Sequence, residues 1–169
     1  MAQIEGEIMI ERPVEEVFDF VADERHEPRF NPRMVHADVI SGGPIGLGTR
    51  FRTELQTMGR TMPMIVEFTA YERPWRLGSM TRSSMMETEG ELTFESAPGG
   101  TRMRWSWDVR PRGALKMMAP FVGMIGRGQE RRIWGSLKRL LETQPQDGDS
   151  ASALEPETLP HLSAERRKR

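Results

Sequence analysis

A short amphipathic helix pattern directly follows the first strand pattern of this chain, and that order restricts the possible folds more than any other feature. Residues 3–11 alternate between apolar and polar side chains, as a strand with one buried face does. Pro13 then ends the alternation, and the stretch PVEEVFDFVAD at 13–23 has a helical period. A helix of about ten residues is marginal alone in water, so its apolar side must dock on a larger surface. The positions predicted to dock are Val14, Val17, Phe18 and Val21.

Most of the chain that follows is predicted to be extended. Residues 24–34 carry two prolines and indicate a turn or a second short helical piece, and the glycine-rich stretch SGGPIGLG at 41–48 indicates a connecting loop. Turn residues separate the remaining patterns at short, regular intervals, which is typical of an antiparallel meander of hairpins and not of βαβ units. The predicted strands are 35–40, 49–58, 61–72, 75–83, 85–96 and 101–110.

The period changes again near the C-terminus. From Leu115 to Glu142 apolar residues recur at helical spacing, although Pro120 and three glycines weaken the first half, so this helix is predicted to be kinked or to start late. Residues 144–169 lose the pattern and are polar and acidic before a basic end, which predicts a disordered tail. The expected organisation is one domain at 1–143 followed by this tail.

Composition excludes several classes of function. The 169 residues include no cysteine and three histidines without helical pair spacing, so we expect no metal site and no cofactor. A formal net charge of −1 gives no general attraction to nucleic acid. The sequence has no apolar run long enough to span a bilayer and no secretory signal pattern at its start, so we expect no stable membrane anchoring and a cytoplasmic protein, monomeric or homodimeric.

Five stretches carry a resemblance to a known group of proteins. They are ERPVEEVFDFVAD, EPRFNP, GLGTRFR, YERPWRLGSM and GGTRMRWSWDV, and they occur in the group's order over residues 3–142. In this series the chain resembles the START-related, Bet v 1-like (SRPBCC) superfamily, in particular its polyketide cyclase/dehydrase-like branch. The resemblance implies an α+β helix-grip fold. In that fold a curved antiparallel sheet of about seven strands wraps on a long C-terminal helix, with two short helices after the first strand.

A sheet of this kind encloses a cavity between its inner face and the long helix, and alternation selects the residues that would line it. The same residues could equally fill an ordinary core. They are apolar or aromatic, relieved by small hydroxyls, and several are methionines, whose flexible side chains adapt to varied ligands. The predicted lining is Phe51, Thr53, Leu55, Met64, Val66, Phe68, Leu77, Ser79, Thr81, Met86, Thr88, Leu92, Met103, Trp105, Trp107, Met117, Met118, Phe121 and Ile125.

Charged candidates for this cavity are few. Arg82, Glu54 and Asp108 have the parity of the outer face, where solvated charge is usual. His26 falls in the loop that would flank the mouth of the cavity and could be a general base, but a solvent-exposed histidine without a role is the commoner case. Basic residues on the last helix could meet an acidic partner, or could simply face water. No catalytic residue is assigned from the sequence.

Three functional hypotheses follow. The first is a binding module that holds a small hydrophobic or amphipathic molecule, such as a lipid or a polyketide, between sheet and helix. The second, implied by the resemblance, is a cyclase, aromatase or dehydrase acting on a poly-keto substrate, which would need an acid or base inside the cavity. The third is a protein-interaction module.

Overall fold

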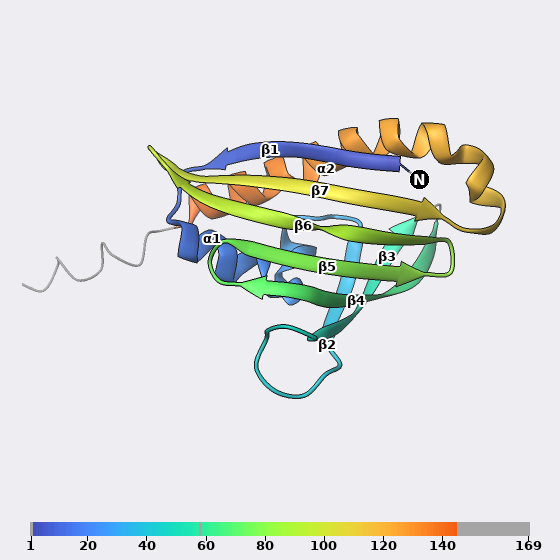
Figure 1. Cartoon of the computed structure of the whole chain (residues 1–169), viewed down its shortest axis with the longest axis horizontal. Helices are drawn as coiled ribbons and strands as arrows, with labels where there is room; N and C mark the ends of the chain where they lie inside the picture. Colours follow the sequence, from blue (N-terminus) through green and yellow to red (C-terminus); the bar gives the residue numbers. More distant parts are fainter. Residues whose placement is uncertain (1, 58, 145–169) are drawn as a thin grey trace, which may run out of the picture.

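Seven strands, two α-helices and two short 3-10 helices make up the described chain (Figure 1). The structure is a computed structural model that describes residues 2–57 and 59–144, without the side chains of 114–115 and 118–123. The predicted tail therefore lies outside the described residues, apart from Gln144. The elements are β1 (Ala2–Ile10), α1 (Val14–Val21), η1 (Glu24–Arg29), β2 (Met34–Val39), β3 (Arg50–Thr57), β4 (Arg60–Glu72), β5 (Arg76–Ser83), β6 (Met86–Ala97), β7 (Gly100–Pro111), η2 (Gly113–Met118) and α2 (Ala119–Thr143).

The strands form one antiparallel sheet in the order β1-β7-β6-β5-β4-β3-β2. From β2 to β7 each strand pairs with the next along the chain, and β1 closes the order by pairing with β7. The register places residues of like parity opposite each other, for example Leu77 against Leu92 and Thr81 against Thr88. The predicted meander and the predicted α+β helix-grip class are therefore confirmed, with strand ends within one or two residues of those expected.

Helix α1 docks through the residues that its period predicted. Val14, Val17, Phe18 and Val21 are all buried, while Glu15 and Glu16 lie in the first turn, where negative charge suits the helix dipole. The Phe18 ring meets Tyr71 and Phe94 edge-on, at centroid distances of 5.3 and 5.2 Å. The helix thus closes one end of the sheet, because its buried side packs against strands β4 and β6.

Helix α2 runs beside β1, at the same edge of the sheet (Figure 1). A methyl group on Gly126 would come within 2.3 Å of Ile4 Cδ1, so helix and strand approach closely there. Lys138 Nζ donates to the carbonyl of Met9 at 2.8 Å, and the buried Arg12 donates from Nε to the carbonyl of Leu141 at 2.8 Å. These contacts fix the C-terminal half of α2 to β1 and to the turn that follows it.

The inward side of α2 differs in phase from the predicted one. Ile133, Trp134, Leu137 and Leu141 are buried, but Ile125, which was predicted to face inward, is 62% exposed. At 100° per residue the buried side centres on Gly126, Glu130 and Leu137, so Ile125 lies on the solvent side. The predicted late start is confirmed, because the 3-10 helix η2 precedes α2 and the α-helix begins at Ala119.

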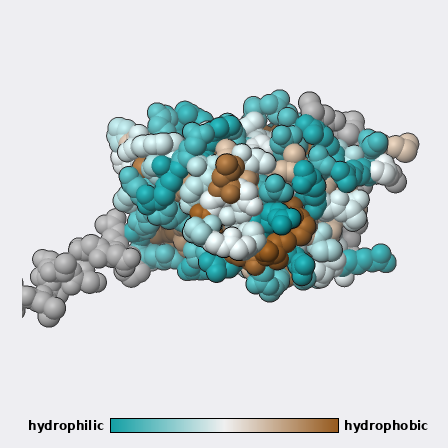
Figure 2. All heavy atoms as spheres, turned by 60° about the horizontal axis from the view of Figure 1, so that its bottom comes forward, coloured by the Kyte–Doolittle hydropathy of each residue, from teal (hydrophilic) through white to brown (hydrophobic). Residues whose placement is uncertain are grey.

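The surface on the side of β2 and of the loop after it is mostly hydrophilic (Figure 2). Hydrophobic atoms gather there in limited patches, and Val35, Ile40 and Leu47 are the large apolar residues of this part of the chain that are exposed. None of the described helices is both long and apolar enough to cross a membrane.

Candidate functional site

The inner face of the sheet is fully buried over one part and partly exposed over another. Every strand residue predicted to line a cavity is buried or half-buried on this face. The half-buried residues belong mostly to the central strands β5 and β6. Their partial exposure indicates that no helix covers this part of the face completely. We call this region the open inner face, and it consists of Leu55, Ser79, Thr81, Met86, Thr88 and Trp107.

Two of the four predicted helix contributors do not join this region. Met117 is 87% exposed and Ile125 is 62% exposed, so the expectation that they face inward is wrong. For Ile125 the reason is the helical phase, and Met117 lies in η2, before α2 begins. Met118 and Phe121 lie outside the described side chains.

Thr53 lies on β3 between residues of two hydrophobic clusters. The main core contains Phe51 and Val66, which are paired across β3 and β4. A smaller cluster of Met34, Met62 and Met64, with Leu55 packed against it, occupies the other end of the same strands. Thr53 pairs with Met64 and is fully buried. Its Oγ1 has no hydrogen-bond partner among the described residues. A buried hydroxyl without a partner is unfavourable, so Thr53 lowers the stability of this part of the core.

A carboxyl group lies between the closed core and the open inner face. Glu130 of α2 accepts hydrogen bonds at Oε2 from two indole groups, Trp107 Nε1 at 3.1 Å and Trp134 Nε1 at 2.9 Å. Trp134 is one helical turn further along α2, whereas Trp107 comes from β7 across the interior. Among the described residues the second oxygen, Oε1, accepts no hydrogen bond, and no lysine or arginine lies within 4.0 Å of the carboxyl. One oxygen is therefore held in place and the other is left for a further partner.

Burial changes the acid–base behaviour of this group. Loss of contact with water raises the pKa of the Glu130 carboxyl from an ordinary 4.5 to about 7. The two indole hydrogen bonds act in the opposite direction, because they stabilise the carboxylate, and the negative charge of Glu27 adds to the increase. Near neutral pH the group is therefore present in both its protonated and its ionised form.

Further carboxyl groups approach the same end of the interior from η1. Glu27 Oε1 accepts a hydrogen bond at 2.7 Å from the buried Asn31. Withdrawal of Glu24 from water, together with the neighbouring charge of Glu27, raises the pKa of Glu24 well above its ordinary value. Among the described residues no three histidine, aspartate or glutamate side chains converge in a way that could hold a metal ion.

Aromatic rings form the wall beside Glu130. Trp134 lies 6.0 Å from Trp105 and 6.0 Å from Phe30, measured between ring centroids. Phe20 continues the series 6.3 Å from Phe30. The Trp105 ring is buried, and its Nε1 has no hydrogen-bond partner among the described residues. The carboxyl of Glu130 is thus surrounded by aromatic surface instead of by counter-charges.

Sequence reasoning missed Glu130, although a signal for it existed. Glu130 precedes Ile133, Trp134 and Leu137 by three, four and seven residues, which is the spacing of one helix face. The adjacent arginines made Glu130 resemble one member of a solvated charged run, which is the usual meaning of such a pattern.

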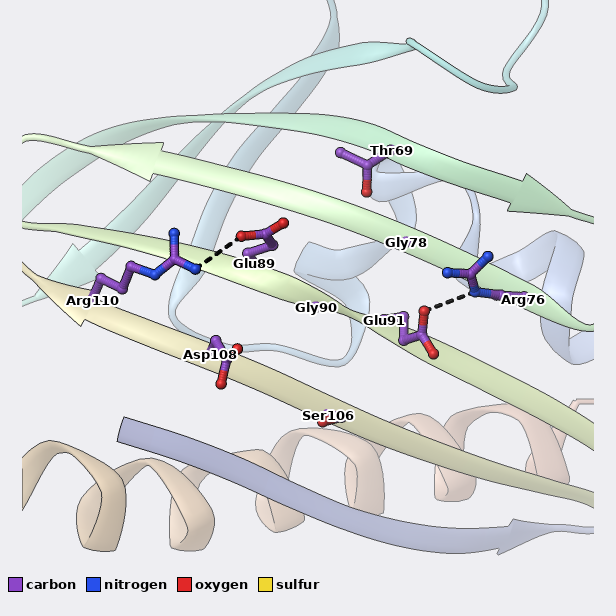
Figure 3. A pocket seen from close by; sticks show the side chains of 9 residues that line it. All are labelled: Thr69, Arg76, Gly78, Glu89, Gly90, Glu91, Ser106, Asp108 and Arg110. Carbon is purple, nitrogen blue, oxygen red and sulfur yellow. Dashed lines mark hydrogen bonds and ion pairs between the residues drawn. The ribbon is translucent and has the colours of Figure 1, made fainter. Parts of the chain in front are cut away.

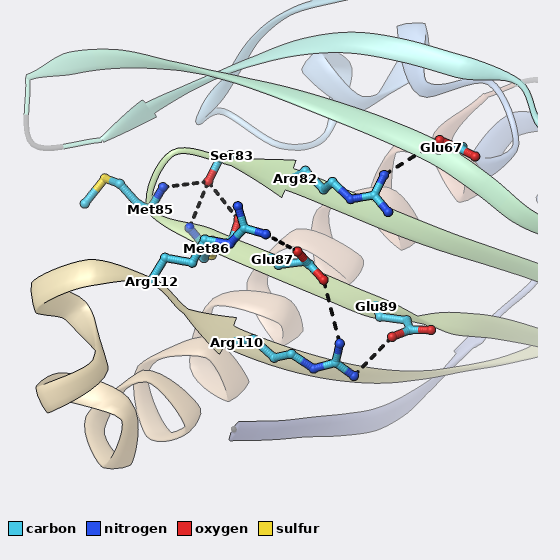
Figure 4. Close-up of polar contacts among 9 residues, drawn as sticks. All are labelled: Glu67, Arg82, Ser83, Met85, Met86, Glu87, Glu89, Arg110 and Arg112. Carbon is cyan, nitrogen blue, oxygen red and sulfur yellow. Dashed lines mark hydrogen bonds and ion pairs between the residues drawn. The ribbon is translucent and has the colours of Figure 1, made fainter.

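The other charged candidates lie elsewhere. His26 Nδ1 is 2.9 Å from the carbonyl oxygen of Phe20, and its ring stacks on the Phe20 ring at 4.4 Å, so its role is local. Arg82 lies on the outer face, as predicted, 3.8 Å from Glu67 (Figure 4).

Two hollows indent the outer face of the sheet. The larger has a volume of about 450 Å³ and is lined by polar residues of β4 to β7 (Figure 3). Its arginines are already paired, Arg76 with Glu91 at 2.7 Å and Arg110 with Glu89 at 3.1 Å. The second hollow, of about 320 Å³, also lies outside the open inner face. Because the arginines that line these hollows are paired with glutamates and solvated, we assign neither hollow a role.

Comparison with known proteins identifies the family. Residues 1–142 match the family described as polyketide cyclase/dehydrase and lipid transport. The chain therefore belongs to this family. No curated protein matches the sequence.

Solved structures share the fold at low sequence identity. A START superfamily protein from Mycobacterium smegmatis aligns with a TM-score of 0.72 and 13% identity, over 84% of this chain and 98% of its own. The protein TTHA0849 from Thermus thermophilus aligns with a TM-score of 0.69 and 16% identity, over 84% and 99%. BexL, a di-domain ARO/CYC from the BE-7585A biosynthetic pathway, aligns with a TM-score of 0.69 and 19% identity, over 85% of this chain and 50% of BexL. Likeness at these identities establishes the fold alone.

Proposed function

We propose that the protein binds a small amphipathic molecule on the open inner face, with Glu130 as the polar anchor. The observation that carries this proposal is the carboxyl of Glu130, which has one oxygen held by two indoles and is largely buried among aromatic rings. In the described part of the chain no cation lies beside it. A buried polar group of this kind is costly unless something completes its hydrogen bonds. The hydroxyls of Ser79, Thr81 and Thr88 offer further hydrogen bonds on the same face. A cytoplasmic location and the absence of stable membrane anchoring remain predictions beside this one.

The expected affinity is moderate. Burial of roughly 300 Å² of apolar ligand surface at about 25 cal/mol per Å² gives a gross ~7 kcal/mol. The costs of association reduce this amount, so micromolar or weaker binding is expected.

A neutral fluorescent probe, N-phenyl-1-naphthylamine, tests the binding. Thr81→Phe places a large side chain on the open inner face and should weaken probe binding by about tenfold or more, because it occupies the space of the probe. Met80→Phe is the matched control, since Met80 is the preceding residue and faces the other side of the sheet. Equal binding by both variants and the unchanged protein would contradict the proposal, as would the absence of saturable binding. Native mass spectrometry of the purified protein would add the mass of any molecule that it carries.

A second function, proton transfer on a poly-keto substrate, is favoured by the same carboxyl. A group whose pKa lies near the working pH is suited to general acid–base catalysis, and burial brings the pKa of Glu130 to about 7. Cyclisation or dehydration of a poly-keto chain needs such a group beside an apolar wall, and the structural neighbour BexL is described as an ARO/CYC.

The two functions can be separated with one variant. Glu130→Gln keeps the shape of the side chain and should still bind N-phenyl-1-naphthylamine, but it cannot transfer a proton. If the protein is an enzyme, it should consume an N-acetylcysteamine thioester of a poly-β-keto acid, and Glu130→Gln should lose this activity by about a hundredfold or more. Consumption of the thioester at the same rate with and without protein leaves binding as the function.

A further inference from the structure

The solvent side of α2 combines exposed apolar residues with unbalanced positive charge. Met124 and Ile125 are 63% and 62% exposed, and Arg131, Arg132 and Arg139 are also exposed. Helical geometry places these residues, with Gly128, on the side opposite the buried Ile133 and Leu137. We call this region the α2 surface, and it consists of Met124, Ile125, Gly128, Arg131, Arg132 and Arg139.

The α2 surface and the outer face of the sheet differ in whether their charged side chains are paired. On the outer face of the sheet arginines alternate with glutamates and pair with them, as Arg110 does with Glu87 at 3.7 Å and with Glu89 at 3.1 Å (Figure 4). By contrast, within the described part of the chain no carboxylate lies within 4.0 Å of Arg131 or Arg132. From residue 112 to residue 141 the only acidic residue is Glu130, which points inward. The α2 surface is therefore positive without compensation.

The apolar residues of the α2 surface restrict the class of partner that this surface can bind. A nucleic acid or an acidic peptide would be recognised by the arginines alone and would gain little from Met124 and Ile125. An interfacial helix places apolar side chains among lipid tails and basic side chains beside the phosphate groups. Along the chain, Met117, which is 87% exposed just before α2, and the exposed Lys116 show the same combination of apolar and basic side chains.

We propose that the α2 surface docks reversibly on an anionic lipid surface, with Met124 and Ile125 entering the interface and Arg131 and Arg132 at the headgroups. Such docking needs no spanning segment, in keeping with the described helices, none of which could cross a membrane. It also does not depend on the ligand site, because no residue of the open inner face takes part in it.

Sedimentation of the full chain with vesicles tests the docking. One set of vesicles is phosphatidylcholine alone, and the other contains about one third phosphatidylglycerol. We expect binding to the anionic vesicles only, weakened by salt. Since a basic residue near an anionic membrane changes the partition about fivefold, Arg131→Gln with Arg132→Gln should weaken binding about 25-fold at low salt. The matched control, Arg104→Gln with Arg110→Gln, removes the same charge from the outer face of the sheet and should have little effect.

Other results would overturn the proposal. Equal binding to neutral and anionic vesicles, no binding to either, or an equal loss in the control pair would contradict docking through the α2 surface. Met124→Ser with Ile125→Ser keeps all the charge and should also weaken binding to the anionic vesicles. If that variant binds the vesicles as the unchanged protein does, and heparin binding shows the same dependence on Arg131 and Arg132, the surface recognises polyanions and not lipids.

Discussion

Replacing Glu130 by glutamine should change how the stability of the protein depends on pH. In the folded protein the pKa of Glu130 is raised to about 7, against an ordinary 4.5. Between these two values the folded state therefore holds the proton more often than the unfolded state. Stability must then fall as pH rises through this window, and the loss is complete above it. Glu130→Gln has no proton to lose, so it should escape this decrease.

The size of the effect follows from the same two values. The difference between about 7 and 4.5 corresponds to ~3 kcal/mol of folding free energy at high pH. About 2.5 kcal/mol of this amount falls between roughly pH 5 and pH 8. A typical domain has about 5–15 kcal/mol of stability in total, so the effect is easily measured. The two indole donors remain satisfied in the variant, because the amide oxygen of glutamine can also accept their hydrogen bonds.

Urea denaturation at about pH 5 and about pH 8 measures this difference. The gain in unfolding free energy from Glu130→Gln should be about 2.5 kcal/mol larger at the higher pH. Glu15→Gln is the control, because Glu15 is an exposed glutamate in the first turn of α1 and its carboxyl stays in water. If Glu130→Gln changes stability by the same amount at both pH values, burial does not govern the carboxyl, and the argument for a polar anchor fails with it.

Four further substitutions test other parts of the structure. Trp107→Phe removes one hydrogen bond to the carboxylate and should raise the titration midpoint of Glu130 by roughly one pH unit, as measured by carbon-13 NMR of the carboxyl. Thr53→Val replaces a buried hydroxyl that has no partner among the described residues, so thermal or urea unfolding should show a stability gain of about 1 kcal/mol. Gly128→Ala should stabilise α2 by up to about 1 kcal/mol, since none of the described residues lies within 4 Å of the added methyl group. Gly90→Ala should destabilise the sheet, because the methyl group would meet a backbone oxygen at 1.9 Å.

The fold could be predicted from the sequence because its signals are local. Alternation within each strand, glycine and proline between strands, and the helical period of Val14, Val17, Phe18 and Val21 each reflect the burial of one side of one element. An antiparallel meander joins neighbouring strands through short turns, so local patterns also determine most of its topology. The pairing of β1 with β7 is the exception, because it joins the first strand of the chain to the last and leaves no local signal.

The candidate site could be predicted only in part, because its signals are not local. The strand residues of the open inner face follow from parity, but their partial exposure depends on where α2 lies, and α2 follows β1. Glu130 is defined by Trp107, which is 23 residues away on another element. The sequence does not indicate that a charged residue within a basic run is buried. The burial of Glu130 is seen only in the structure, where β7 and α2 lie together.

The polar groups of the interior argue that its composition is not optimised for packing alone. Thr53 Oγ1 and Trp105 Nε1 are buried without partners among the described residues, and Glu130 is largely buried without a cation nearby. Each such group costs about 1–3 kcal/mol relative to an apolar side chain of the same shape. Together they approach the total stability of a typical domain, which is about 5–15 kcal/mol. Valine at position 53 and phenylalanine at position 105 would remove this cost for two of the groups, so the interior keeps polar groups that packing alone does not require.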